Sequence, residues 1–309
     1  MAELLSPEAE QFGAVVTDAL EAEGGVDLAR AAEADPDVRV GYGELLGSLG
    51  VWDLDPSTDG VELEAAAAAC RAAGRVALPY PVAERVAATG LDGVDALVHV
   101  DPDVPRVGHA GLGLVWRAVR DGFSSAVVEE AAPVRSRLGF FAADVVVGPW
   151  AETEGRDELA RLVTLQCWTL LGVLDGTAGH TYRYVTEREQ FGAPLASFQA
   201  LRFALTDVEV HRLGLVELAR YTLWSLGEDR PSAWGDALAL RLAALEAAEA
   251  VFRICHQAHG AIGFCDESDL SWLSRHSQVL RRLPWGRSQT EAALVAELSQ
   301  VPLAGPFSG

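Results

Sequence analysis

The sequence predicts a mainly α-helical protein with a small β insertion in its middle. Long stretches before residue 92 and after residue 153 place apolar residues at spacings of three and four, the pattern of amphipathic helices. Between them, short valine-rich runs bounded by Pro, Gly and Asp indicate strands. We therefore expect an N-terminal helical domain over residues 1–92, a short β-domain over residues 93–152 and a C-terminal four-helix bundle over residues 153–309.

Local signals place the elements of the first two regions. Ser6 and Pro7 suit the first turn of a helix, because Ser can cap a helix N-terminus and Pro has no amide hydrogen to leave unbonded there. The Ala-rich run from Val61 to Ala73 predicts another, nearly ideal helix. Three β-branched runs predict strands at residues 96–100, 125–128 and 144–147.

The last region predicts long helices that pack together. Its apolar periodicity persists over residues 156–185, 199–226 and 233–262, and each stretch is long enough for a bundle helix. Residues 290–298 add a shorter helix at the end. The sequence contains no internal repeat or flexible linker, so the helices should pack as one unit.

Composition excludes several classes of protein. All 24 basic residues are Arg, and the excess of Asp and Glu gives a formal net charge of -21, which disfavours nucleic acid as a partner. No secretory leader or membrane span is evident, and the four Cys are scattered without a CxxC pair. We expect a soluble, cytoplasmic protein with free thiols and no membrane partner.

Two separated motifs in the last region carry chemistry. Residues 188–199 read REQFGAPLASFQ, and they combine a permanently charged Arg with two Phe and a Gln around a Gly-Pro helix break. Residues 257–264 read QAHGAIGF, with small residues that let a backbone approach a ligand closely. Two motifs in this order and in a helical context are more specific than either alone.

Together these motifs resemble the acyl-CoA dehydrogenase family. The resemblance is firm from about Arg161 onward and looser before it. It implies a helical domain, a β-domain and a helical bundle, with FAD bound between subunits. The β-domain here is shorter than the family's, and it lacks the aromatic and Ser/Thr segment that contacts the flavin ring.

The resemblance also implies a set of FAD-binding residues. Arg188 would hold the pyrophosphate, because its guanidinium is a charged, forked donor; the alternative is a surface charge at a helix end. Residues of the second motif would complete the clamp from the facing subunit. The full set of cofactor-binding candidates is Arg188, Phe191, Phe198, Gln199, Gln257, Gly260, Ala261 and Gln289.

The catalytic base of the family is missing from this sequence. An acyl-CoA dehydrogenase removes a proton beside the thioester while the flavin accepts a hydride, which requires a carboxylate near the flavin. At the two positions where family members carry that acid, this sequence has Trp285 and Leu162. The chain therefore has no catalytic residue of its own at either place.

Three polar residues on the first long helix are weaker substitutes. Asp175, His180 and Tyr184 lie where a bundle should be mostly apolar, so one could act as a replacement base or proton relay. The competing interpretation is a set of hydrogen-bonded core or interface groups. A metal site at Cys255, His256, His259 and Cys265 is set aside, because the spacing matches no common zinc pattern.

The resemblance implies a division of labour between two chains. A clamp without a base resembles the smaller, degenerate subunit of the heteromeric α2β2 acyl-CoA dehydrogenases of actinobacterial steroid side-chain catabolism. The expected partner is then a paralogous subunit that supplies the base, and FAD is shared with it. The substrate would be a bulky acyl-CoA, and electron-transfer flavoprotein joins the candidate partners.

Two other functions stay open on the sequence alone. The fold could have lost flavin chemistry and could catalyse a hydration, dehydration or cyclisation with Asp175, His180 or Tyr184. Alternatively, the chain could be a structural scaffold for a catalytic partner. The scaffold hypothesis predicts that Arg188 points to solvent or to protein rather than to a cofactor phosphate.

Overall fold

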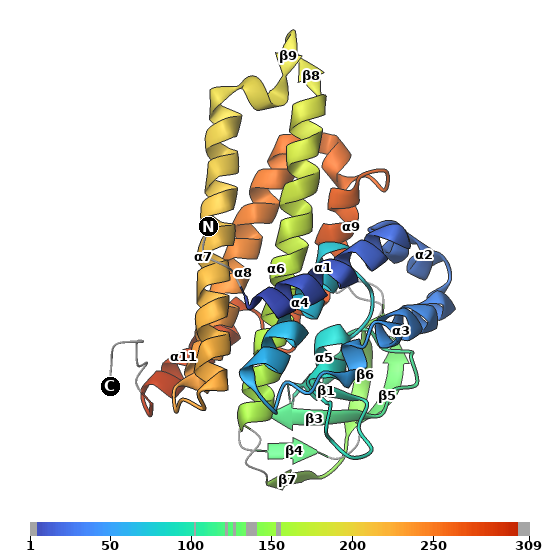
Figure 1. Ribbon diagram of the computed structural model, residues 1–309, viewed down its shortest axis with the longest axis vertical. Coiled ribbons are helices and arrows are strands. Elements are labelled where there is room, and N and C mark those ends of the chain that lie inside the picture. The colour runs from blue at the N-terminus through green and yellow to red at the C-terminus, as the bar shows by residue number, and fades with distance from the viewer. Residues whose placement is uncertain are drawn as a thin grey trace.

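The computed structural model describes residues 5–101, 103–120, 123–125, 128–133, 141–152 and 156–301. Three long helices run side by side along the molecule, the N-terminal helices cross them near the middle, and the small sheet lies at one end (Figure 1). A hairpin projects from the opposite end of the long helices. The mainly helical fold with a small β insertion is therefore confirmed.

The N-terminal region is helical throughout its described length. Asp59 caps the helix that follows it, because its side chain accepts hydrogen bonds from the amides of Val61 and Glu62, both at 2.9 Å. Ser6 makes no such capping bond, although Pro7 does begin a helix. The helices are α1 (Pro7–Ala22), α2 (Asp27–Ala34), η1 (Pro36–Val38), α3 (Arg39–Ser48), η2 (Val51–Asp53), α4 (Gly60–Arg75) and α5 (Val82–Val86).

The sheet has seven strands in the described part of the chain. Its hydrogen-bonded order is β2-β6-β5-β3-β4-β7, and β1 pairs with β3 in parallel, with Ala96 opposite Trp116. All other pairs are antiparallel. The strands are β1 (Ala96–His99), β2 (Arg106–Val107), β3 (Trp116–Arg120), β4 (Phe123–Ser125), β5 (Val128–Pro133), β6 (Ala143–Val147) and β7 (Trp150–Glu152).

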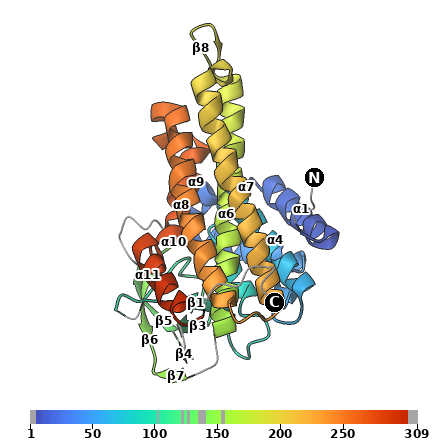
Figure 2. The same cartoon turned by 90° about the vertical axis from the view of Figure 1, so that its left-hand side faces the viewer.

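The C-terminal region forms the helical bundle. Helices α6, α7 and α8 pack along one another, and α11 packs on α8 (Figure 2). A short hairpin, β8–β9, and a 3-10 helix, η3, connect α6 to α7. The elements are α6 (Arg156–Glu187), β8 (Glu189–Gln190), β9 (Ala193–Pro194), η3 (Leu195–Ser197), α7 (Gln199–Gly227), α8 (Ala233–His259), η4 (Gly260–Phe264), α9 (Asp269–His276), α10 (Gln278–Arg282) and α11 (Arg287–Leu298).

One bundle helix is shorter than the periodicity predicts. The sequence pattern extends to Ile262, whereas α8 ends at His259 and the chain continues as η4. Gly260 has a φ of 65°, a left-handed value that Gly adopts without a steric penalty, so it ends the regular helix. This end of α8 borders a groove at the hairpin end of the bundle.

Helices α4 and α6 approach each other closely through glycines. A Cβ atom built at Gly172 would overlap the carbonyl oxygen of Arg71 on α4, and one at Gly74 would overlap the carbonyl oxygen of Thr169 on α6. By contrast, a Cβ at Gly179, on the same helix α6, would meet no atom within 4 Å. The crossing of these helices therefore depends on particular glycines.

Two alanine variants on α6 test this packing. Gly172→Ala is expected to lower the free energy of unfolding by about 1–3 kcal/mol, because the backbones of α4 and α6 must separate. Gly179→Ala, the matched control, is expected to raise it by roughly 0.5–1 kcal/mol through helix propensity. Urea unfolding of both variants measures the difference. Equal effects at the two positions would show that the crossing has room for a methyl group.

Candidate functional site

A groove lies at the hairpin end of the bundle. It has a volume of about 790 Å³ and is bounded by the end of α6, the hairpin segment, the start of α7 and the end of α8. Both sequence motifs contribute to it. The residues that line it are Tyr184, Arg188, Gln190, Leu195, Phe198, Ala200, Leu201, Ala204, Gln257, Ala258, His259, Gly260, Ala261 and Ile262.

Local backbone bonds fix the first motif at this groove. The amide of Arg188 donates to the carbonyl of Tyr184 at 2.8 Å, and the carbonyl of Arg188 accepts from the amide of Leu195 at 2.8 Å. Between them, Phe191 and Gly192 have φ values of 55° and 79°, which turn the chain back as a hairpin. The motif is thus both the connection between two bundle helices and one wall of the groove.

Arg188 brings a positive charge that no residue in the described part of the chain neutralises. Its guanidinium makes no ion pair or hydrogen bond with any residue that the structure describes, and it lines the groove. An unpaired guanidinium can donate two parallel hydrogen bonds to a phosphate. The groove can therefore accept an anionic group at this end.

The second motif supplies the opposite wall. Gln257, Gly260 and Ala261 line the groove beside Arg188, and no atom lies within 4 Å of the place where a side chain of Gly260 would begin. The small residues leave the backbone there accessible to a ligand. Both motifs line one groove within this chain, and a clamp completed by Gln257, Gly260 and Ala261 of a facing subunit stays a prediction.

An aromatic pair covers the floor of the groove. The rings of Tyr184 and His259 stack with centroids 4.3 Å apart and an interplanar angle of 12°. His259 Nδ1 lies 2.9 Å from the carbonyl oxygen of Cys255, which assigns the ring proton to Nδ1 and leaves Nε2 as an acceptor. Burial lowers the pKa of His259, so the neutral ring is favoured.

Three predicted cofactor residues lie outside the groove lining. Phe191, at the hairpin tip, is 93% exposed and contacts Phe198 edge to face, with centroids 6.2 Å apart. Gln199 is exposed at the start of α7. Gln289 lies at the start of α11, where its Oε1 accepts from the amide of Gly286 at 3.2 Å. The structure thus brings Arg188, Phe198, Gln257, Gly260 and Ala261 together, but not these three.

Neither of the residues at the two base positions, Leu162 and Trp285, has an acidic side chain. Leu162 is fully buried in α6. Trp285 packs edge to face on His99 of β1, with centroids 4.3 Å apart, and its carbonyl oxygen accepts from Arg241 Nη2 at 2.8 Å. An aromatic ring and a histidine therefore contact each other where the resemblance places the catalytic carboxylate.

The three substitute candidates on α6 do not form a common site. Asp175 accepts from Arg71 at 2.6 Å and from Arg212 at 2.8 Å, so it joins α6 to α4 and α7. His180 Nδ1 lies 3.1 Å from a carboxylate oxygen of Asp269 in α9. Tyr184 instead faces the groove. Their contacts favour the interpretation of hydrogen-bonded packing groups over that of an acid–base pair.

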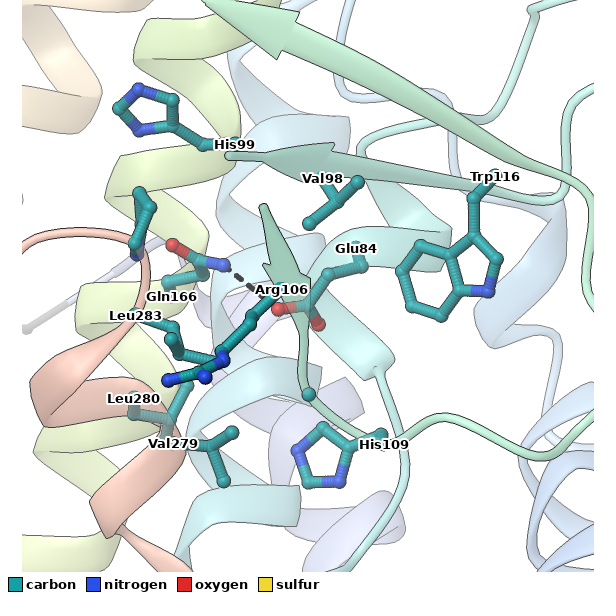
Figure 3. Close-up of a pocket in the computed structure, with 12 residues that line it drawn as sticks. Glu84, Val98, His99, Arg106, His109, Trp116, Gln166, Val279, Leu280 and Leu283 are labelled. Carbon is teal, nitrogen blue, oxygen red and sulfur yellow. Dashed lines mark hydrogen bonds between the residues drawn. The ribbon is translucent and has the colours of Figure 1, made fainter. Parts of the chain in front are cut away.

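A second, small cavity lies between the N-terminal helices, the sheet and the bundle (Figure 3). It has a volume of about 20 Å³ and contains Glu84, His99, His109 and Gln166. Gln166 Nε2 donates to Glu84 Oε1 at 2.8 Å. This cluster was not predicted from the sequence. The strand that contains His99 was predicted, but His99 itself, a lone polar residue in an apolar run and the only available signal, was not used.

The two cavities differ in what they can hold. The groove is large enough for a nucleotide-sized group and offers one free guanidinium, an amide side chain and an open backbone. The second cavity is far too small for a flavin ring. The groove is thus large enough for a nucleotide, whereas the second cavity is not.

None of the described helices is long and apolar enough to cross a membrane.

Comparisons with known proteins agree with this geometry. The acyl-CoA dehydrogenase C-terminal domain model matches residues 158–299, which include both motifs. A 3-sulfinopropanoyl-CoA desulfinase from Paraburkholderia xenovorans is 34% identical over 112 residues, or 35% of this chain and 28% of that protein. Across three such curated relatives the matched segment spans only 28 to 33% of their length.

Solved structures extend the similarity to nearly the whole chain. A variant of the Tcur3481-Tcur3483 steroid ACAD superimposes with a TM-score of 0.77 at 19% identity, over 96% of this chain and 99% of the other. The ChsE4-ChsE5 complex from Mycobacterium tuberculosis gives 0.75 at 18% identity, over 97% and 100%. The chain therefore has the acyl-CoA dehydrogenase fold, and its residues 158–299 match the acyl-CoA dehydrogenase C-terminal domain.

Proposed function

We propose that this chain is one subunit of a heteromeric, FAD-dependent acyl-CoA dehydrogenase. The complex would dehydrogenate a bulky acyl-CoA, such as a steroid side-chain thioester, between its α and β carbons. The observation that carries the proposal is a groove lined by Arg188, whose guanidinium has no partner among the described residues, in a chain whose two base positions hold Trp285 and Leu162. The chain keeps a nucleotide anchor and lacks the acid that the reaction needs.

The groove residues have distinct roles in this proposal. Arg188 would hold the pyrophosphate, and the Gln257 amide and the backbone around Gly260 would hold the adenosine. Phe198 and the Tyr184–His259 pair provide aromatic surface beside it. When bound, FAD supplies the hydride acceptor of the reaction. This chain's own contribution is to bind and orient one end of the cofactor.

A paralogous partner supplies the remaining parts. Proton abstraction from the carbon beside the thioester requires a carboxylate, and the partner provides the catalytic Glu and the surface for the isoalloxazine. The two similar structures are of the Tcur3481-Tcur3483 steroid ACAD and of the ChsE4-ChsE5 complex, and both names pair two proteins, which supports a heteromeric arrangement. Electron-transfer flavoprotein is the proposed acceptor of the electrons.

An exposed apolar stripe on α7 supports the presence of a partner. Phe203, Val210, Leu213 and Trp224 share one face of the helix, because their separations of 7, 3 and 11 residues are close to whole helical turns. Their side chains are 62%, 65%, 50% and 38% exposed. Apolar side chains exposed along one face of a helix indicate a protein contact.

Purification with and without the paralogue tests the proposal. Co-expression is expected to give a yellow complex that oxidises acyl-CoA, whereas this chain alone should be colourless and inactive. Absorbance in the flavin bands and reduction of an electron acceptor measure the two properties. If the chain alone binds FAD and turns over substrate, the division of labour is wrong. A colourless, inactive complex would instead favour the cofactor-free enzyme or the scaffold.

A further inference from the structure

The small cavity of Figure 3 is a polar site in an otherwise apolar junction. Glu84 enters it from α5, Gln166 from α6, His99 from β1 and His109 from the loop after β2. Apolar side chains of α10 and the segment after it, including Val279 and Leu283, close the other side. The cavity therefore joins the N-terminal helices, the sheet and the bundle.

Several polar atoms around the cavity have no partner in the described part of the chain. These are both ring nitrogens of His99, Nδ1 of His109 and Oε1 of Gln166, all of them buried. Buried polar atoms without a protein partner are ordinarily satisfied by an ordered water, which makes about three hydrogen bonds. A volume of about 20 Å³ is sufficient for about one water molecule.

We propose that this cavity binds a single internal water molecule, which connects Gln166 Oε1 and the Glu84 carboxyl to an imidazole nitrogen of His99 or His109. The water donates to Gln166 Oε1 and to the ring nitrogen, and the Glu84 carboxyl is its third partner. The hydrogen bond from Gln166 Nε2 to Glu84 Oε1 holds the two long side chains in place for this network. The site is separate from the groove, and it stands whether or not FAD is bound.

The charge states of the surrounding groups are compatible with a neutral network. Burial raises the pKa of Glu84, against the hydrogen bond from Gln166, which lowers it. Burial, together with the charge of Arg241 for His99 and of Arg39 and His276 for His109, lowers the pKa of both imidazoles to about 3. Burial thus favours the uncharged form of all three groups.

The other groups that face the network do not change this balance. Arg106, at the cavity edge on β2, is paired with Asp144 of β6 at 2.7 Å. On α4, the thiol of Cys70 is fully buried, and burial raises its pKa, so it stays uncharged. The α10 side contributes Val279 and Leu280, which carry no charge. The cluster is therefore a neutral polar junction that also supports the His99–Trp285 contact.

Counting long-lived internal waters tests the proposal. Oxygen-17 relaxation dispersion of the solvent should show one fewer such water in Gln166→Leu than in the wild type. Gln11→Leu, an exposed Gln on α1, is the matched control and should leave the count unchanged. An unchanged count in Gln166→Leu overturns the proposal. A crystal structure of the wild type without water density between Gln166 and the two histidines also overturns it.

A second variant, which should fold even if Gln166→Leu does not, tests whether Glu84 is uncharged in this network. Glu84→Gln preserves size and hydrogen bonding, so it should fold and retain the internal water. Because the folded-state pKa of Glu84 is raised, its stabilisation is complete below the ordinary value of 4.5 and is lost as pH rises through the folded-state pKa. The stability of wild type relative to Glu84→Gln should therefore fall progressively above pH 4.5.

Urea unfolding of wild type and Glu84→Gln over a pH series measures this trend. A difference that does not vary with pH would mean that the pKa of Glu84 is the same in the folded and unfolded chains, and the neutral network would be wrong. Acyl-CoA oxidation by the assembled complex should be the same for both proteins. A large loss of activity in Glu84→Gln would show that Glu84 acts in catalysis instead, which contradicts its role in a closed junction.

Discussion

Replacing Arg188 by alanine is expected to weaken FAD retention by the assembled complex about 30-fold. A hydrogen bond from a guanidinium to a phosphate is worth about 2 kcal/mol, which corresponds to that factor in affinity. Arg188 has no partner among the described residues, so its removal costs no intramolecular contact there and the fold should be unaffected. Flavin content after gel filtration and a titration of the apo-complex with FAD measure the effect.

Two further substitutions distinguish a specific role of the Arg188 guanidinium from a general effect of removing a positive charge. Arg202→Ala removes another guanidinium near the start of α7 that does not line the groove, so FAD retention should be unchanged. Arg188→Lys keeps the charge but loses the forked donor, so an intermediate affinity is expected. Equal FAD content in Arg188→Ala and wild type would remove the pyrophosphate role from this residue.

Replacing Arg241 by leucine is expected to lower the free energy of unfolding by roughly 3 kcal/mol. Arg241 is 3% exposed, and its Nη2 donates to the carbonyl oxygens of Leu283 at 2.7 Å and of Trp285 at 2.8 Å. Each bond to a charged donor contributes about 1.5–3 kcal/mol, while removal of a buried cation returns part of its desolvation cost. The two carbonyls would be left without this donor.

Urea unfolding of Arg241→Leu measures this loss, and Arg253→Leu is the control. Arg253 lies on the same helix α8 but is exposed, so its replacement should change stability by less than about 0.5 kcal/mol. Trp fluorescence should also change in Arg241→Leu, because the segment that carries Trp285 loses its anchor. Equal stability of the two variants would show that contacts other than Arg241 hold this segment.

The long elements could be predicted because their signal is local. The periodicity over residues 156–185 and 199–226 corresponds closely to α6 and α7, since three- and four-residue spacing reports directly on one helix face. The strand predicted at residues 125–128 overlaps β4 and β5 by one residue each, and residues 126 and 127 lie outside the described part of the chain. The short helices and the strands β2, β3 and β7 were not predicted. Their residues are defined by pairing across the sheet, as Trp116 is with Ala96, and no local pattern encodes that partner.

The residues of the candidate site were likewise predictable only where their signal is local. The clamp segment was found because a Gly-Pro break between two helices fixes Arg188 at a helix end, a local consequence of the sequence. The cavity at Glu84 was not found, because its members come from α5, β1, α6 and the loop after β2 and meet only in the folded chain. Phe191 was assigned to the cofactor, but its position at an exposed hairpin tip depends on whatever contacts that tip.

Helix α6 also sets the distance between the two sites. Gln166 lies about a third of the way along α6 and Arg188 directly follows its last residue, so a rise of 1.5 Å per residue separates them by about 33 Å. Changes so far apart, without shared partners, act independently. The double variant Glu84→Gln with Arg188→Ala should therefore show the unfolding behaviour of Glu84→Gln and the FAD affinity of Arg188→Ala. One of the two sites can then be engineered without a change in the properties of the other.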